Sequence, residues 1–287
     1  MSNAYSDLDT LKSPSVLNVT DNAHDGRLLG LLEAASRWID GYCDRRFAAV
    51  HGERRFDGRG RATLTVSDLV AVSELRVRDA SGRWECWPSA DWLLYPLNAA
   101  PTEPGGRPYT RILLASGERR RFPLNRAGVA ISGIWGYGDV REDAGMRVAA
   151  GSAVGIGDGT VTVASVSADA AIPLSAGHTV RIGDEQLYVT GAAAGEGATT
   201  LSVQRGVNGT DAAAHAAGAG LTVYRYPEAV AEACLLQAAV WWRERFGGPF
   251  PLSEGSPAAD GRDVGGVSPT VRALLAPHRR RNAVLGV

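Results

Sequence analysis

Residue types that could do chemistry are scattered along the chain. The five histidines are His24, His51, His178, His215 and His278. None stands at metal-ligand spacing from another, and the sequence has no HExxH helix. It also lacks a GxxxxGK[ST] phosphate loop and a GxSxG nucleophile elbow. The sequence therefore predicts no catalytic residue, no metal site and no cofactor, although a triad assembled from distant residues stays open.

Two short stretches resemble parts of known sites. Residues 155–159, with the sequence GIGDG, are similar to a fragment of a dinucleotide loop, but no helical pattern follows them. We therefore interpret this stretch as a turn. Asp184 and Glu185 could form a carboxylate pair, and Asp158 could join them around calcium. Because their spacing matches no EF-hand loop, we expect turn and strand-edge residues there.

The composition is that of an ordinary soluble globular protein, with 45% hydrophobic and 21% charged residues. The formal net charge is −1, so no overall field attracts the chain to nucleic acid or to a membrane. The three cysteines are scattered, and we expect buried free thiols in a reducing compartment. The N-terminus shows no secretory signal, and the longest apolar stretch, residues 229–242, is too short to span a bilayer.

The hydrophobic pattern predicts an α+β fold, with helices flanking an antiparallel β region. Residues 26–45 place apolar and charged side chains on opposite faces of a helix. Short apolar runs separated by turns follow between residues 48 and 138, as in antiparallel strands. A second helix begins at Pro227 and is apolar nearly all round, which indicates burial on several sides and favours a subunit interface.

Residues 146–226 differ in composition from the rest of the chain, since they are rich in alanine, glycine, valine and threonine. Turn dipeptides such as Asp158-Gly159 and Asn208-Gly209 separate the candidate strands 160–166, 179–189, 201–203 and 221–224. We predict an inserted small all-β module, barrel-like or sandwich-like. The expected domains are therefore an N-terminal arm (1–25), a core (26–145 and 227–250), the insert (146–226), and a flexible linker, short helix and basic tail (251–287).

The C-terminal segment combines an apolar helix with positive charge. Ser268-Pro269 is a helix start, and residues 279–281 are three consecutive arginines. Three interpretations stay open: a solvated tail, a nucleic-acid contact, and docking on an acidic protein partner. The apolar residues one turn earlier favour docking, because they supply an anchor beside the charge.

Five segments, in chain order, resemble the head–tail connector proteins of tailed bacteriophages, also called head-completion or adaptor proteins. They are AASRWIDGYCDRRF (34–47), DWLLYP (91–96), VAISGIWGY (129–137), the helix of residues 227–246 and LLAPHRR (274–280). The insert looks like a module of other phage structural proteins, on residues 177–185, 205–210 and 212–215. Compact connectors lack such a block.

The resemblance implies a structural neck protein that is not an enzyme and needs no cofactor. Such proteins form a homo-oligomeric ring, generally a dodecamer, under the portal protein, and they receive stopper or tail-terminator proteins on the opposite face. DNA passes through the ring as cargo, and no membrane takes part. The implied location is the virion neck at the head–tail interface, after assembly in the host cytoplasm.

Two residue sets follow as hypotheses. The portal-docking set is Val271, Arg272, Leu274, Leu275, Arg279, Arg280 and Arg281. The inter-subunit packing set is Trp38, Leu235, Trp241 and Trp242. The alternative function is a virion binding protein whose β module recognises a glycan or a protein, and a hydrolase is the third hypothesis.

Overall fold

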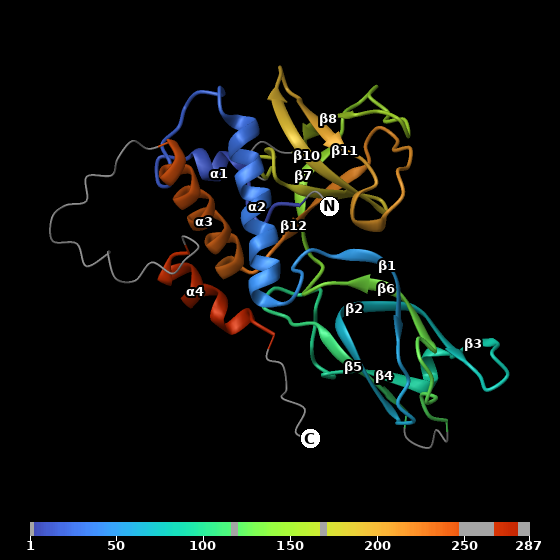
Figure 1. Ribbon diagram of the computed structural model, residues 1–287. Coiled ribbons are helices and arrows are strands. Elements are labelled where there is room, and N and C mark those ends of the chain that lie inside the picture. The colour runs from blue at the N-terminus through green and yellow to red at the C-terminus, as the bar shows by residue number, and fades with distance from the viewer. Residues whose placement is uncertain (1–2, 116–119, 167–170, 247–266, 281–287) are drawn as a thin grey trace, which may run out of the picture. The chain divides into compact units, whose positions relative to one another are not determined.

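The computed structural model describes residues 3–115, 120–166, 171–246 and 267–280 (Figure 1). The chain forms two compact units. The first, here called the helix–barrel unit, comprises Met1–Arg45, Glu142–Val207 and Asp211–Val287. The second, the sheet unit, comprises Arg46–Arg141 and Asn208–Thr210. Helices and antiparallel strands are combined, so the predicted α+β class is confirmed.

Two long helices, α2 (Asp25–Cys43) and α3 (Glu228–Phe246), pack against each other in the helix–barrel unit. The apolar face of α2 is buried, and Asp44 ends the helix in a left-handed conformation with a φ of 51°. In α3, Pro227 precedes the first turn, and its carbonyl accepts from the amides of Val230 and Ala231. Both predicted helices are present within a few residues of their expected limits.

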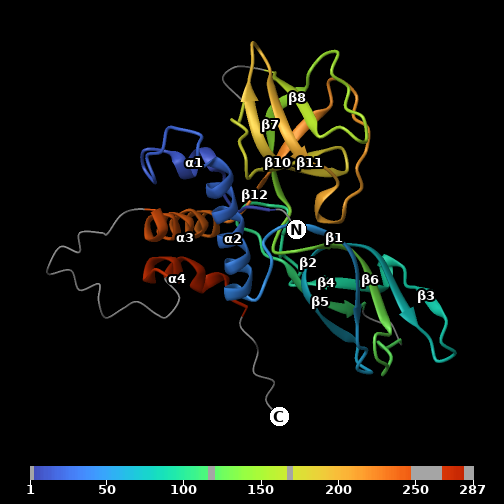
Figure 2. The same ribbon diagram turned by 45° about the horizontal axis from the view of Figure 1, so that its top comes forward.

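Two short helices complete the helical part. α1 (Leu8–Lys12) contacts α2 and α3, and α4 (Pro269–Leu275), which is followed by a 3-10 turn at Ala276–His278, contacts α3. Figure 2 shows α3 lying between α1 and α4. Residues 1–25 were expected to be a polar arm, yet Leu8 and Leu11 of α1 are buried. Described helices include none that is long and apolar enough to cross a membrane.

The insert, together with residues 140–145, forms a closed six-stranded barrel. Its strands are β7 (Val140–Val148), β8 (Thr160–Ser165), β9 (Thr179–Ile182), β10 (Glu185–Ala194), β11 (Thr199–Gln204) and β12 (Gly220–Arg225). They follow the order β10-β11-β8-β7-β12-β9, and closure removes the free sheet edges. The predicted all-β module is therefore present in its barrel form. Alternate side chains fill the interior, mostly valine, leucine and isoleucine.

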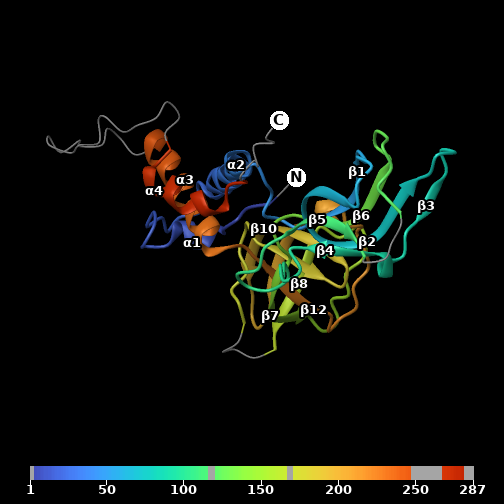
Figure 3. The ribbon, with the colours of Figure 1, turned by 90° about the horizontal axis from the view of Figure 1, so that it is seen from below.

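The sheet unit holds the other six strands, in the order β1-β6-β2-β5-β4 with β3 paired to β2. They are β1 (Val50–Phe56), β2 (Thr63–Arg78), β3 (Trp84–Cys86), β4 (Trp92–Tyr95), β5 (Tyr109–Leu114) and β6 (Val129–Trp135). A 3-10 turn at Ser89–Asp91 precedes β4. Figure 3 shows these strands from below, with β3 at the outer edge. Residues 64–66 and 75–78, which lie among the short strands expected between residues 48 and 138, belong to one long strand, β2.

Close packing explains the spacing of small and aromatic residues in β6. A Cβ on Gly133 would lie 2.1 Å from the carbonyl oxygen of Ala71, so only glycine permits this approach of β2 to β6. Two residues later, Trp135 is 1% exposed, and its indole Nε1 donates to the Gly52 carbonyl over 2.8 Å. The backbones of β2 and β6 therefore approach closely here, and Trp135 anchors the core of the sheet unit.

The two units and the expected domains divide the chain by different criteria. Residues 1–45 and the barrel strands group together by contact, whereas the expected limits at residues 25, 145, 226 and 250 follow changes in composition. Contacts within the helix–barrel unit explain this grouping. The Leu8 amide donates to the Ala176 carbonyl over 2.8 Å, and the rings of Tyr5 and Tyr226 meet edge to face. The compositional boundaries stay a prediction.

Candidate functional site

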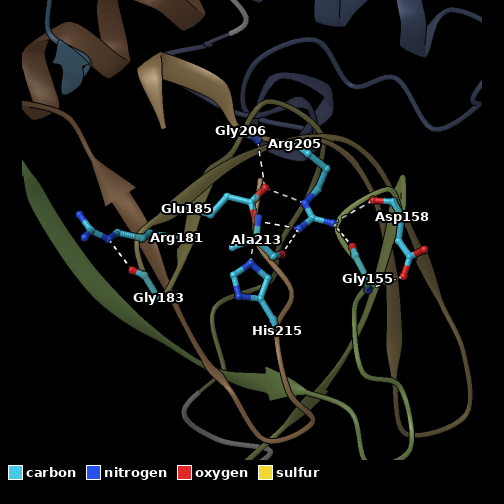
Figure 4. Close-up of polar contacts among 9 residues, drawn as sticks. All are labelled: Gly155, Asp158, Arg181, Gly183, Glu185, Arg205, Gly206, Ala213 and His215. Atoms are coloured by element: carbon cyan, nitrogen blue, oxygen red, sulfur yellow. Dashed lines mark hydrogen bonds and ion pairs between the residues drawn. The ribbon is translucent and has the colours of Figure 1, made fainter. Parts of the chain in front are cut away.

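A buried polar cluster surrounds Glu185, the first residue of β10 (Figure 4). The Glu185 side chain is fully buried. Arg205 donates to both of its carboxylate oxygens, from Nε and from Nη2, each over 2.7 Å. The backbone amides of Gly206 and Ala213 donate over 3.0 Å each, and His215 Nε2 lies 2.7 Å from Oε2.

Arg205 uses its remaining donors on the backbone. Its Nη1 donates to the carbonyls of Gly155 and Asp158, over 2.8 and 3.1 Å. Its Nη2 also donates to the Ala213 carbonyl over 2.5 Å. The Glu185–Arg205 pair therefore ties two loops, residues 155–158 and residues 205–215, to the barrel strands. We call this cluster the Glu185 centre.

The Glu185 centre stabilises the barrel and leaves little capacity for chemistry. Burial by itself would raise the pKa of Glu185, but the hydrogen bonds from Arg205, Ala213, His215 and Gly206 outweigh it and lower the pKa to about 2. A general acid or base needs a pKa near the working pH and an oxygen open to the substrate. Glu185 offers neither, because five donors already occupy its oxygens.

The structure does not bring the suggested calcium ligands together. The Asp184 side chain is fully exposed and pairs with Arg181 over 2.6 Å, whereas the Glu185 side chain is fully buried and pairs with Arg205. The Asp158 carboxylate accepts from the Gly155 amide over 2.7 Å, so residues 155–158 form a turn, as predicted. Among the residues that the structure describes, no group of histidine, cysteine, aspartate and glutamate could hold a metal ion.

A serine, a histidine and an aspartate also meet where α1 begins. The Ser175 hydroxyl donates to Asp7 Oδ1 over 2.8 Å, and His178 Nε2 lies 3.8 Å from Asp7 Oδ2. His178 Nδ1 faces the Ser175 backbone amide at 3.1 Å and not the hydroxyl. A nucleophilic triad needs the histidine to take the serine proton, so this arrangement is not one. Asp7 also accepts from the Thr10 amide, which makes it the N-cap of α1.

The thiols are free, and two of the three are inert. Cys43 and Cys234 are buried, and burial raises the pKa of each to about 11. A thiol with such a pKa is a poor nucleophile at neutral pH. Cys86 differs from the expectation of buried thiols, since it is exposed at the end of β3.

The predicted portal-docking residues lie in two different environments. Val271 and Leu275 are fully buried, and α4 packs on α3, so these two cannot act as exposed anchors in this conformation. The Arg280 amide donates to the Cys43 carbonyl over 2.8 Å, and Arg279 lies over the Tyr42 ring at 4.9 Å. Arg272 and Leu274 are partly exposed, and Arg281 lies outside the described residues. Docking itself stays a prediction.

The predicted inter-subunit residues divide in a similar way. Leu235 is buried at 7% exposure and belongs to the interior of the unit. Trp38, Trp241 and Trp242 are partly exposed. Trp38 stacks on Tyr42 at 5.1 Å, and Trp242 meets His24 edge to face at 5.3 Å. The three tryptophans thus keep part of their surface available for a neighbour, and that role also stays a prediction.

Comparison with known proteins gives little outside support. No protein-family model matches the chain, and no curated protein matches it. Among solved structures, it aligns with a chain of the "Neck of empty GTA particle computed with C6 symmetry". The identity is 16%, the alignment covers 97% of this chain and 88% of that one, and the TM-score is 0.38. A likeness at that TM-score carries no argument about fold or function.

Proposed function

We propose that this protein is a structural subunit of the neck of a tailed, phage-like virion. It forms a homo-oligomeric ring under the portal protein, joins the head to the tail and lets DNA pass. One observation carries the proposal. The five segments that resemble connector proteins fall in order on or at α2, β4, β6, α3 and α4, and within the helix–barrel unit α2 packs on α3 and α3 on α4.

The polar clusters fit a structural role. The hydrogen bonds of the Glu185 centre anchor two loops of the same chain. Asp7 accepts from Ser175 and caps α1, so it too bonds within the chain. The ordered barrel adds a rigid module to the unit that contains the helices. We propose that the barrel widens the contact between a subunit and its neighbour or decorates the ring.

Ring formation would use the partly exposed tryptophans Trp38, Trp241 and Trp242. Aromatic side chains of this kind commonly dominate the binding energy of protein interfaces. Docking on the portal would use the exposed part of the C-terminal segment, with Arg272 and Arg279 as the charged members. Stopper or tail-terminator proteins would bind the opposite face, and the virion neck would be its location.

A second candidate function is recognition of a protein or glycan by the barrel. It is favoured by two large apolar side chains that the barrel loops expose, Ile156 at 64% and Val166 at 62%. Exposed apolar residues are typical of binding surfaces, although single ones are common on any protein.

Native mass spectrometry of the purified chain separates the two functions. We expect a closed oligomer, alone or after addition of the portal protein of the same particle. Replacing Trp241 and Trp242 with alanine should shift the distribution toward monomer, because the interface loses its aromatic contacts. The matched control is Trp84→Ala, in the sheet unit. A strict monomer with or without portal, combined with glycan binding that Ile156→Ser abolishes, would support the second function instead.

A further inference from the structure

The near-neutral net charge conceals an uneven distribution between the two units. Residues 46–141 contain 15 arginines against 10 aspartates and glutamates. The rest of the chain has the opposite excess, with 15 basic and 21 acidic residues. The sheet unit is therefore positively charged, and the positions of its arginines show where this charge is concentrated.

Two loops at one end of the sheet unit hold much of this charge: residues 57–62 after β1 and residues 120–128 before β6 (Figure 1). Their backbones are joined by hydrogen bonds. The Gly58 amide donates to the Asn125 carbonyl over 3.0 Å, and the Gly60 amide donates to the Phe122 carbonyl over 2.8 Å. The end of β2 joins them, since the Arg78 amide donates to the Gly128 carbonyl over 2.8 Å.

A close backbone approach and a side-chain hydrogen bond also hold the two loops together. A Cβ on Gly58 would lie 1.8 Å from the Pro123 carbonyl oxygen, so glycine is required for this close approach. The Asp57 carboxylate accepts from the Ala127 amide over 2.7 Å, and it is the one acidic side chain in residues 57–62 and 120–128. The loops thus form an ordered platform.

Five exposed arginines project from this platform and the adjoining end of β2. They are Arg59, Arg61, Arg78, Arg121 and Arg126, and we call them the arginine tip. Within the described part of the chain, none of the five has an ion-pair partner. Arg78 and Arg121 donate to backbone carbonyls, over 3.0 and 3.2 Å, and so keep their full charge available.

Other arginines of the same unit are neutralised. Arg55, on β1, and Arg76, on β2, pair with Glu53 of β1, over 3.1 and 2.5 Å. Arg120, beside the arginine tip, pairs with Asp91. Exposed like charges held together without acidic partners repel one another, and they gain most from a ligand that brings several negative charges at once.

We propose that the arginine tip binds the phosphate backbone of double-stranded DNA. The guanidinium fork matches the oxygens of a phosphate, and the exposed positions require little desolvation before contact. A duplex presents many phosphates in a regular row, so several of these arginines can bind one ligand, and binding to an acidic surface of a second copy is a separate outcome of the experiment below. This inference rests on the proposed function, because a neck protein meets the DNA that passes through it. DNA binding itself can be measured on the isolated chain.

Salt dependence of binding tests the proposal. The full chain and a short fluorescent duplex are titrated by fluorescence anisotropy at several salt concentrations. With about five phosphate contacts, the log–log slope of affinity against salt should be about −4 to −5. Replacing Arg61 and Arg121 with alanine should make that slope less steep by about 2, because each arginine lost removes about one contact.

The control is a double replacement of Arg55 and Arg76 with alanine. These arginines are already paired to Glu53, so the slope should stay unchanged. No binding to duplex at low salt, or equal losses in the two double variants, would overturn the inference. So would unchanged DNA affinity together with weaker self-association, since the arginine tip would then bind a second copy. Failure of DNA binding while closed oligomers still form would leave the proposed neck function standing.

Discussion

A Glu185→Gln variant should lose about 3–5 kcal/mol of unfolding free energy, the cost typical of removing one partner of a buried ion pair. The change keeps the shape of the side chain but leaves the Arg205 guanidinium, at 9% side-chain exposure, without its counter-charge. It also weakens the acceptors for the amides of Gly206 and Ala213. Chemical denaturation at neutral pH measures the loss, and the loops of residues 155–158 and 205–215 should gain amide exchange.

Acid should reproduce the same loss in the unaltered protein. The ordinary pKa of the Glu185 carboxyl is 4.5 and the folded value is about 2. A lowered folded pKa means that the carboxylate contributes its full stability above about pH 4.5 and loses it as the pH falls toward 2. The difference corresponds to about 3 kcal/mol. Glu185→Gln should therefore have a flatter stability profile across this window than the unaltered protein.

The neighbouring Asp184→Asn change is the matched control, because that side chain is fully exposed. We expect no measurable change in unfolding free energy. If Glu185→Gln were as stable as Asp184→Asn, the buried carboxylate would not be holding the loops, and the structural role of the Glu185 centre would be wrong.

Replacing Trp135 with alanine should destabilise the sheet unit by about 3–5 kcal/mol, as for other large buried aromatics. Trp135 is 1% exposed, packs on Phe56 at 5.6 Å and lies under the Arg54 guanidinium at 4.6 Å. Trp135→Phe keeps most of the buried area but loses the hydrogen bond to Gly52, and it should cost about 1–2 kcal/mol. Thermal and denaturant unfolding measure both variants.

Trp84→Ala serves as the control in the same unit. Trp84 is 38% exposed on β3, so its removal should change the unfolding free energy by less than about 1 kcal/mol. Equal effects at positions 84 and 135 would contradict the assignment of Trp135 as the core anchor of the sheet.

Periodic segments could be predicted from the sequence, because their burial leaves a regular pattern. The helices α2 and α3 and the barrel strands other than β7 are of this kind, whereas β7 was not among the candidate strands. β1 carries Glu53, Arg54 and Arg55 in succession, so its hydrophobic pattern cannot be distinguished from that of a loop. β2 runs through the polar residues Ser67 and Asp68, which resemble a turn. α1 is a single turn and a half, too short for a helical period to appear.

The Glu185 centre could not be predicted, because its members are far apart in sequence. Glu185, Arg205 and His215 meet only when the barrel closes and residues 205–215 fold back across it. A glutamate at the start of a mostly apolar strand was the available signal, but an exposed residue at the end of a strand gives the same pattern. The burial of Val271 and Leu275 could not be predicted either. The apolar face of an amphipathic helix can pack on its own chain or on a partner, and the sequence pattern is the same in both cases.

The arginine tip could not be predicted from the net charge, because that value averages over the whole chain. A net charge of −1 for the whole chain suggested no attraction to nucleic acid. Only the structure shows that Arg61 and Arg121 lie on joined loops, whereas Arg55 and Arg76 are paired with Glu53. The local charge depends on which arginines form ion pairs, and the composition does not show that.

Electron microscopy of the purified chain with the portal protein of the same particle tests the neck assignment most directly. The proposed function predicts a closed ring of this chain seated coaxially under the portal, with an open lumen and one subunit at each repeated position. Single copies scattered on the outside of the portal, or no complex at all, would contradict it.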